Sequence, residues 1–105
     1  MNTTSNAEPF PKPRVRITYC TQCNWLLRAA WMAQELLSTF AFELGEVALR
    51  PGTGGIFEIH IDETRVWSRA EQGRFPDIKE LKQIVRDHVA PDKSLGHTDR
   101  HTQQL

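Results

Sequence analysis

The stretch Val15-Arg16-Ile17-Thr18-Tyr19-Cys20-Thr21-Gln22-Cys23 decides the fold, because it carries a predicted strand into a predicted helix. Its first five residues alternate apolar and polar side chains, the pattern of a half-buried strand. Apolar residues then recur with helical spacing from Trp25, which predicts a helix over residues 22–40. Cys20 and Cys23, the chain's only cysteines, stand at the junction. A Cys-x-x-Cys at such a junction in a short α/β chain indicates reversible dithiol chemistry.

The predicted helix start gives the two sulfurs different expected roles. Unpaired N–H groups and the positive end of the helix dipole stabilise a thiolate there. If both cysteines lie in the first turn, their Cβ atoms are about 5–6 Å apart, and a small adjustment closes a disulfide. Helix geometry favours Cys20 as the more exposed, attacking thiol and Cys23 as the resolving one. Because Thr21 and Gln22 offer only neutral hydrogen bonds, we expect a moderate reduction potential, closer to that of a reductant than of a strong oxidase.

Length and composition limit the class of protein. With 105 residues the chain is expected to form one domain. Lysine plus arginine (13) balances aspartate plus glutamate (13), so no net charge favours nucleic acid or membrane. No apolar run could span a bilayer, and residues 1–13 contain no apolar signal-peptide core. Two cysteines are too few for a secreted disulfide scaffold, so we expect a cytoplasmic protein without nucleic-acid or membrane partners.

The remaining patterns predict an α/β domain with the order β-α-β-β-β-α. Residues 1–13 are expected to form a disordered leader, residues 14–90 the domain and residues 91–105 a flexible polar tail. Residues 51–55 are too rich in glycine and proline for a regular element and are expected to form a loop. The further elements expected are strands over 46–50, 56–61 and 64–68 and a last helix from Pro76 to Pro91.

Strand alternation also predicts how the layers pack. The first β-α-β unit should be a right-handed parallel crossover and the last two strands an antiparallel hairpin, giving a four-stranded mixed sheet. All four strands alternate apolar and polar residues, whereas strands covered on both faces show continuous apolar runs. Both helices are therefore expected to pack on one face, leaving the other open to water or a partner. The side chains expected on this open face are Arg16, Glu46, Arg50, Glu58, His60 and Arg65.

Trp67 is expected on the open face by the same alternation. An exposed tryptophan there is a candidate anchor for a protein partner, since aromatic residues often carry binding energy at interfaces. It could equally be folded under the nearby loop. Scattered exposed apolar residues are ordinary, which weakens the interpretation as a partner anchor.

Three further motifs follow the cysteines in order: Thr53-Gly54-Gly55-Ile56-Phe57-Glu58, Val66-Trp67-Ser68-Arg69 and Gly73-Arg74-Phe75-Pro76-Asp77. With the strand–Cys-x-x-Cys–helix segment they make residues 14–89 resemble the selenoprotein W/T/H-like (Rdx-type) family. The resemblance implies a thioredoxin-like fold and a thiol-based redox function, with glutathione and protein thiols or disulfides as partners and no cofactor. It also places the selenium of the family's selenoproteins where Cys23 stands, which points to Cys23 as the attacking residue. The order of attack within the pair is therefore left open.

The thioredoxin-like fold also indicates what borders the cysteines. Ordinary thioredoxins carry a cis-proline facing the active cysteines, and here Thr53-Gly54-Gly55 takes that place, while Pro51 is not assigned the role. Loops after the strands gather near the helix start in this fold, so this segment and Phe75 are expected at the site. The site-bordering residues expected are Thr21, Gln22, Trp25, Thr53, Gly54, Gly55 and Phe75.

Two other functions fit parts of the pattern. The cysteines could form half of a zinc site with His97 and His101, but 73 residues separate Cys23 from His97, where about 12–15 is usual, and we expect no metal. An adaptor module would instead use the open sheet face and Trp67 to bind another protein under control of the disulfide. The favoured hypothesis is a thiol–disulfide oxidoreductase or redox sensor that uses Cys20 and Cys23.

Overall fold

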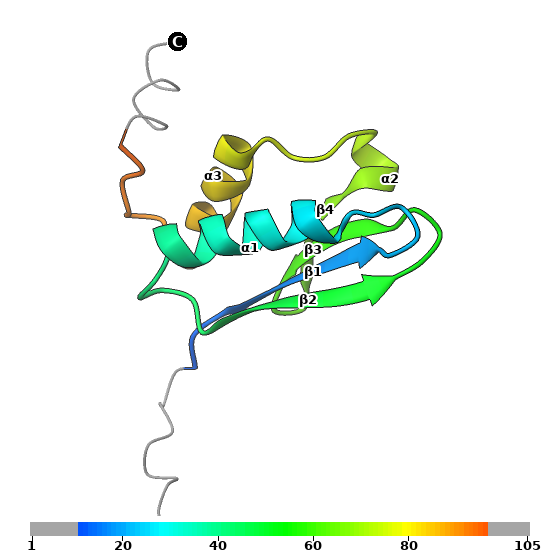
Figure 1. Cartoon of the computed structure of the whole chain (residues 1–105). Coiled ribbons are helices and arrows are strands. Elements are labelled where there is room, and N and C mark those ends of the chain that lie inside the picture. Colours follow the sequence, from blue (N-terminus) through cyan, green and yellow to red (C-terminus); the bar gives the residue numbers. More distant parts are fainter. Residues whose placement is uncertain (1–10, 97–105) are drawn as a thin grey trace, which may run out of the picture.

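The computed structural model describes residues 11–96, so residues 1–10 of the predicted leader and 97–105 of the predicted tail lie outside the described residues. The elements are β1 (Arg14–Cys20), α1 (Leu26–Thr39), β2 (Glu46–Gly52), β3 (Phe57–Ile61), β4 (Thr64–Ser68), α2 (Arg69–Gln72) and α3 (Ile78–Val89), as Figure 1 shows. The predicted order of strands and long helices is confirmed. None of the helices within residues 11–96 has the length and apolar content needed to cross a membrane.

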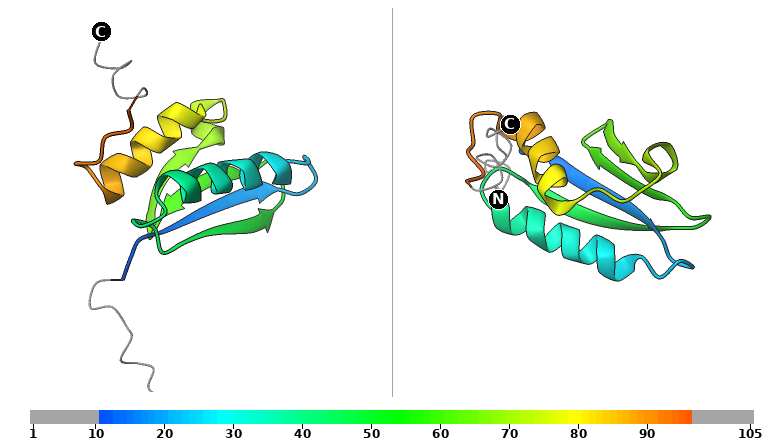
Figure 2. Two further views of the ribbon diagram at one scale, coloured as in Figure 1. Left: turned by 60° about the vertical axis from the view of Figure 1, so that its left-hand side comes forward. Right: turned by 90° about the horizontal axis from the view of Figure 1, so that it is seen from above.

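The four strands form one mixed sheet in the order β2-β1-β3-β4. β1 pairs in parallel with β2 and antiparallel with β3, and β3 pairs antiparallel with β4. α1 and α3 lie on the same face of this sheet, as the two views in Figure 2 show. The expected α/β architecture of a thioredoxin-like fold, with both long helices on one face, is confirmed.

One hydrophobic core lies between the sheet and the long helices. Full burial of an Ile, Leu or Phe side chain stabilises a fold by about 1.5–3 kcal/mol relative to exposure. Alternate residues of β1 and β3 enter this core, as the sequence pattern predicts. Its buried members are Val15, Ile17, Tyr19, Ala29, Met32, Ala33, Leu36, Phe40, Leu44, Phe57, Ile59, Ile61, Trp67, Leu81 and Val85.

Trp67 is buried, with only 4 % of its surface exposed, so its predicted place on the open face was wrong. The cause is a β-bulge between β3 and β4. Arg65 lies opposite His60, whereas Trp67 lies opposite Ile59. Val66 between them is therefore an extra residue, which moves Trp67 onto the helix-covered face. Trp67 is not an exposed anchor for a partner.

The last helix begins at Ile78 rather than Pro76, with Asp77 as its N-cap, and two predicted boundaries near the cysteines were also wrong. α1 begins at Leu26 rather than residue 22, because Asn24 has a left-handed conformation (φ 61°) that an α-helix cannot contain. β2 continues to Gly52, so Pro51 belongs to an edge strand, where proline is tolerated, rather than to the loop. The short helix α2 was not predicted, although Ser68 caps it by accepting a hydrogen bond from the Glu71 N–H.

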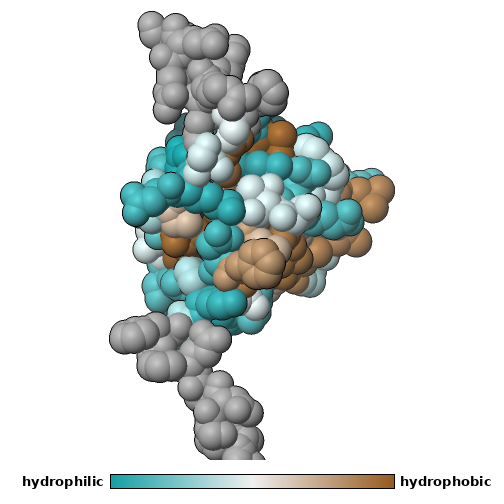
Figure 3. Space-filling view, turned by 90° about the vertical axis from the view of Figure 1, so that its left-hand side faces the viewer, coloured by the Kyte–Doolittle hydropathy of each residue, from teal (hydrophilic) through white to brown (hydrophobic). Residues whose placement is uncertain are grey.

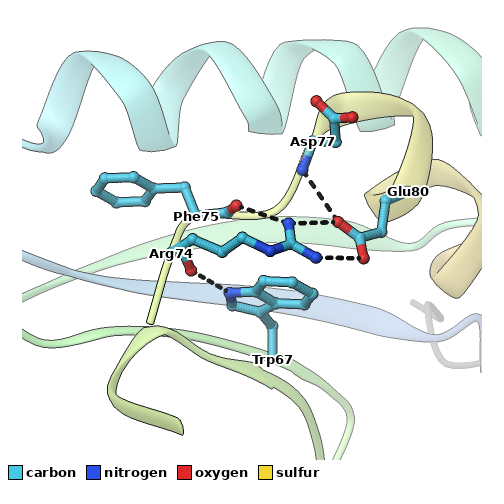
Figure 4. Close-up of polar contacts among 5 residues, drawn as sticks. All are labelled: Trp67, Arg74, Phe75, Asp77 and Glu80. Atoms are coloured by element: carbon cyan, nitrogen blue, oxygen red, sulfur yellow. Dashed lines mark hydrogen bonds and ion pairs between the residues drawn. The ribbon is translucent and has the colours of Figure 1, made fainter. Parts of the chain in front are cut away.

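A polar network fixes the segment between α2 and α3 (Figure 4). The Arg74 guanidinium donates hydrogen bonds of 2.9 and 3.0 Å to the Glu80 carboxylate and one of 3.2 Å to the Phe75 carbonyl. Trp67 Nε1 donates to the Arg74 carbonyl oxygen at 3.1 Å. Glu80 also accepts from the Asp77 N–H, which completes a capping box at the start of α3. These contacts hold the backbone that carries Phe75.

The substitution Glu80→Gln tests this network through its pH dependence. The hydrogen bonds from Arg74 hold the pKa of the Glu80 carboxyl below its ordinary value of 4.5. A lowered folded-state pKa contributes stability above the unfolded pKa, and this is lost as pH falls through the folded pKa. Because the carboxyl is partly exposed, we expect Glu80→Gln to cost only about 1 kcal/mol at pH 7, measured by urea unfolding. The cost should shrink as pH is lowered and Glu80 takes up its proton, and a cost that stays the same at every pH would contradict the network.

His60 lies on the open face of the sheet, as predicted, among charged neighbours. Burial and then the positive charge of Arg16 lower the pKa of His60 from its ordinary value of 6.5, while Glu58 acts in the opposite direction. His60 Nδ1 is buried and has no hydrogen-bond partner among residues 11–96. Folding therefore favours the neutral imidazole over the charged one more than the unfolded chain does.

Replacing His60 by asparagine should reduce the loss of folding stability that the protein shows as pH falls below 7. A lowered folded-state pKa means that the unfolded chain binds the proton more tightly, so stability falls as pH drops below about 6.5. Urea unfolding at pH 7 and pH 5 should show a larger loss for the wild type than for His60→Asn. Thr64→Asn, at an exposed position of β4 without a titratable group, serves as the control and should lose as much as the wild type. Equal losses in wild type and His60→Asn would overturn this account.

Candidate active site

Cys20 and Cys23 lie at the end of β1 and in the turn that leads to α1. They form a disulfide, with their Cα atoms 5.3 Å apart, inside the usual range for such a bond. Thr21 anchors the turn to β2, since its N–H and its hydroxyl both donate to the Gly52 carbonyl, at 3.0 and 3.1 Å. The Asn24 N–H donates to the Thr21 carbonyl at 3.1 Å and closes the turn. Gln22 was expected at the start of the helix and is instead an exposed residue of this turn.

The two sulfurs differ in exposure, and in the opposite sense to the one that helix geometry predicts. Cys20 has no exposed surface, whereas Cys23 is only partly buried. Cys20 is the last residue of a central strand and lies opposite Gly52 of β2. The expectation of a more exposed Cys20 assumed a helix that begins at the cysteines, and it was wrong because the helix begins after them. Cys23 therefore offers the accessible sulfur.

The N-terminus of α1 adjoins the cysteine turn. Trp25 occupies the N-cap position and makes no side-chain hydrogen bond there, and the first turn contains no acidic residue. The N–H groups of the first turn therefore lack the capping partner that Ser, Thr, Asp or Asn would supply. Their partial positive charge lies beside the turn that holds Cys23, where it favours a thiolate. The helix N-terminus is therefore still expected to favour a thiolate, as the sequence suggested, although the helix begins at Leu26 rather than at residue 22.

The glycine segment after β2 approaches Cys20 directly. The Gly55 N–H donates a hydrogen bond to Cys20 Sγ at 3.3 Å. Gly54 and Gly55 have left-handed φ angles of 73° and 77°, which place that N–H toward the sulfur. A Cβ on Gly52 would come within 2.8 Å of the Ile56 side chain, so the backbone here also needs a small residue. Thr53 is exposed in the same segment.

Three aromatic rings form a cluster beside the cysteine turn. Phe75 makes edge-to-face contacts with Trp25 and Phe57, with ring centroids 4.9 and 5.0 Å apart, and the Trp25 and Phe57 centroids are 6.3 Å apart. The backbone N–H of Trp25 donates a hydrogen bond to the Cys20 carbonyl at 3.4 Å, which connects the cluster to the turn. Trp25 and Phe75 were expected here, whereas Phe57 was expected only as a core residue of its strand.

Two arginines cover this aromatic cluster, and the sequence reasoning missed both. The Arg28 guanidinium carbon lies 4.1 Å from the Phe75 ring centroid, and that of Arg69 lies 4.9 Å from the same centroid and 5.0 Å from the Trp25 ring. The two guanidinium carbons are therefore at most about 9 Å apart, the sum of the two distances to Phe75. Two positive charges at that distance repel by about 0.5 kcal/mol in water and about 2 kcal/mol at the effective dielectric of a protein surface.

A signal for one of these arginines was present in the sequence. Arg28 follows the Cys-x-x-Cys by five residues and stands in the first turn of the helix, where a cation opposes the helix dipole. Arg69 comes from α2, which the sequence patterns did not predict. The expectation of neutral hydrogen bonds around the cysteines considered only Thr21 and Gln22. The fold adds two positive charges, from α1 and α2, to the neighbouring aromatic cluster.

An apolar groove lies on the surface at the start of α1. It has a volume of about 390 Å³ and is lined by Tyr19, Thr21, Asn24, Leu26 and Leu27. Leu27 is 80 % exposed. Apolar surface recurs farther along the molecule, and Figure 3 shows brown side chains gathered across the end at which α1 finishes. Within residues 11–96 the exposed large apolar residues are Leu26, Leu27, Trp31, Leu37, Phe42 and Leu49.

A second cavity of about 320 Å³ lies over β1 and β2 on the open face of the sheet. Its lining includes Arg16 and Arg50, two of the residues predicted for that face, and the ion pair between Arg14 and Glu46. Neither cysteine is among its lining residues. His97 and His101, considered as zinc ligands, lie outside the described residues.

Comparisons with known proteins agree with this geometry. A crystal structure of a protein from Bordetella parapertussis is 65 % identical, superposes with a TM-score of 0.73, and covers 74 % of this chain and 99 % of its own. The structure of a selenoprotein W-related protein from Vibrio cholerae is 53 % identical, with a TM-score of 0.72, and covers 73 % of this chain and 96 % of its own.

A curated relative from Heterodera glycines, described as a putative esophageal gland cell secretory protein 6, is 34 % identical over 86 residues. That match covers 82 % of this chain but only 33 % of the relative, so the chain spans about a third of that protein's length. Residues 14–87, which hold the whole Cys-x-x-Cys site and the aromatic cluster, match the Rdx family, and the chain therefore belongs to the Rdx family.

Proposed function

We propose that the protein exchanges thiols and disulfides with glutathione or with protein thiols through Cys20 and Cys23. The observation that carries this proposal is the asymmetry of the pair. One sulfur is accessible and lies beside a positively charged helix end, while the other is buried, bonded to the first and hydrogen-bonded to a backbone N–H. An accessible attacking thiol with a sheltered resolving thiol is the arrangement that dithiol exchange requires.

The reaction runs in two displacements, starting from the reduced dithiol. The Cys23 thiolate attacks one sulfur of a substrate disulfide, the substrate S–S bond breaks, and the departing thiolate takes a proton from water. The Cys20 thiolate then attacks Cys23 Sγ and releases the second substrate thiol. The protein gains a Cys20–Cys23 disulfide, and its two electrons have reduced the substrate to two thiols. Glutathione or a protein dithiol returns the pair to the reduced form by the reverse steps.

The surroundings suit each sulfur to its step. Cys23 lies before an uncapped helix N-terminus, which favours its thiolate over its thiol. Cys20 must carry negative charge while buried, and such a charge is costly unless it is hydrogen-bonded. The Gly55 N–H supplies one such bond at 3.3 Å. Exposure and the family resemblance both support Cys23 as the attacking residue of the proposed reaction.

The adaptor hypothesis has less support. It relied on Trp67 as an exposed anchor, and Trp67 is buried and hydrogen-bonded to the Arg74 carbonyl. The open face remains as a charged surface with a cavity over β1 and β2. A reducing cytoplasmic setting remains our proposal for localisation, since that compartment keeps a dithiol available for exchange.

Single cysteine variants test the proposed order. Reduced Cys20→Ser should accumulate a stable mixed disulfide on Cys23 when treated with oxidised glutathione, because no second thiol can release it. Cys23→Ser should react at least about tenfold more slowly, since its remaining thiol is buried. Intact-protein mass spectrometry measures the glutathionyl adduct over time, and peptide mapping locates it.

Thermal unfolding of both variants is the control, because a serine at Cys20 that opened the fold would expose other groups. Equal adduct formation in both folded variants would contradict the assigned order. Full turnover of a disulfide substrate by both variants would sink the proposed function itself, because one thiol would then suffice.

A further inference from the structure

We propose that Arg28 and Arg69 form an anion-binding subsite beside Cys23, which selects small disulfides and thiols that carry a carboxylate near the reacting sulfur. The inference rests on the proposed function, because a subsite of this kind guides a substrate only if Cys23 exchanges with one. It adds the two residues that would recognise the substrate and the chemical class that they would favour.

The guanidinium groups keep their hydrogen-bond donors available. Each lies over an aromatic ring, Arg28 at 4.1 Å from the Phe75 centroid and Arg69 at 4.9 Å. A cation–π contact supplies neither an oxygen acceptor nor an opposite charge, so it leaves the in-plane N–H groups of each guanidinium without an anionic partner. Those in-plane donors match the two oxygens of a carboxylate. The rings thus fix the orientation of two cations without neutralising them.

No carboxylate of the described chain pairs with either group. Arg65 pairs with Glu58 and Glu71, and Arg74 pairs with Glu80, but no ion pair within residues 11–96 involves Arg28 or Arg69. Arg69 Nε is buried and lacks a hydrogen-bond partner among these residues. A buried donor without a partner is costly, so this guanidinium is poorly compensated within residues 11–96. Two unpaired cations at most about 9 Å apart therefore present a site of positive charge.

The position of Arg28 conflicts with local helix stability. A cation in the first turn of a helix opposes the positive end of the dipole, and no acidic residue of that turn compensates it. Local conflicts of this kind concentrate at functional sites. A bound anion would relieve the conflict, because it would interact favourably with both arginines and with the helix N-terminus at once.

The cluster that carries the arginines adjoins the cysteine turn along the chain. Trp25 lies two residues after Cys23, and its backbone N–H donates to the Cys20 carbonyl. Phe57 follows two residues after Gly55, whose N–H donates to Cys20 Sγ. The proposal places the remaining groups of a small substrate bonded to Cys23 on the side of this cluster.

Three small disulfides of similar size and different charge test the preference. Dithiodipropionate carries carboxylates, bis(2-hydroxyethyl) disulfide is neutral, and cystamine carries ammonium groups. For each disulfide, the second-order rate constant with the reduced protein is divided by the rate constant with dithiothreitol. This ratio corrects for the intrinsic reactivity of the disulfide. The wild type should favour dithiodipropionate, and added salt should weaken the preference.

The double variant Arg28→Gln, Arg69→Gln should lose about tenfold or more in rate with dithiodipropionate and change less than about twofold with the neutral disulfide. Arg28→Lys with Arg69→Lys should restore much of the preference, because the charge is kept. Arg14→Gln is the matched control, since Arg14 begins β1 at the end opposite Cys20, and it should behave as the wild type. An equal loss with all three disulfides would overturn the subsite and assign the arginines to the fold or to the thiol.

A binding measurement separates this inference from the proposed function. S-methylglutathione carries carboxylates but cannot exchange disulfides, and its binding to the oxidised protein is followed by NMR at the Trp25 indole N–H. Saturable binding in the wild type, lost in the double glutamine variant, supports the subsite even if no exchange occurs. Exchange that requires Cys23 but shows no charge preference and no such binding supports the function and rejects the subsite.

Discussion

The site depends on one constraint, the burial of Cys20 at the end of a central strand. β1 is paired on both sides, and its last residue lies opposite Gly52 while the Gly55 N–H reaches its sulfur. No exposed surface remains on Cys20, so the chain leaves the strand through a tight turn and brings Cys23 toward solvent. The two backbone segments that contact Cys20 both need glycine. A Cβ on Gly52 would meet the Ile56 side chain, and Gly54 and Gly55 have positive φ angles. The unequal exposure of the two sulfurs follows from this packing.

Charge around the pair comes from parts of the chain that lie far apart in sequence. The uncapped start of α1 contributes a partial positive charge, and Arg28 and Arg69 add full charges over the rings of Trp25 and Phe75. Phe75 can support them because the Arg74–Glu80 network fixes the backbone on either side of it. A reactive thiol beside a positive surface is expected to favour thiolate chemistry and anionic partners. The Rdx family assignment concerns this same segment of the chain.

Sequence reasoning predicts the fold well wherever one face of a strand is buried in regular register. Val15, Ile17 and Tyr19 alternate into the core as expected, and the motifs at the glycine segment and at Phe75 reach the cysteines. It fails where a single residue changes the backbone. The extra residue Val66 reverses the orientation of Trp67, and the left-handed Asn24 delays α1, which reverses the expected exposure of the two cysteines. Periodicity carries no information about such irregularities, nor about which distant arginines will stack on a ring.

The central claim is that Cys20 and Cys23 form a reversible two-electron couple. The most direct measurement of this couple equilibrates the full chain in glutathione redox buffers and alkylates the free thiols. Mass spectrometry then counts the alkylated thiols. The account predicts that two thiols disappear together at one defined potential, and that each single serine variant shows only a glutathione adduct or no change. Two thiols that stay free across the range, or that oxidise independently, would contradict the claim, because neither behaviour belongs to an intramolecular dithiol.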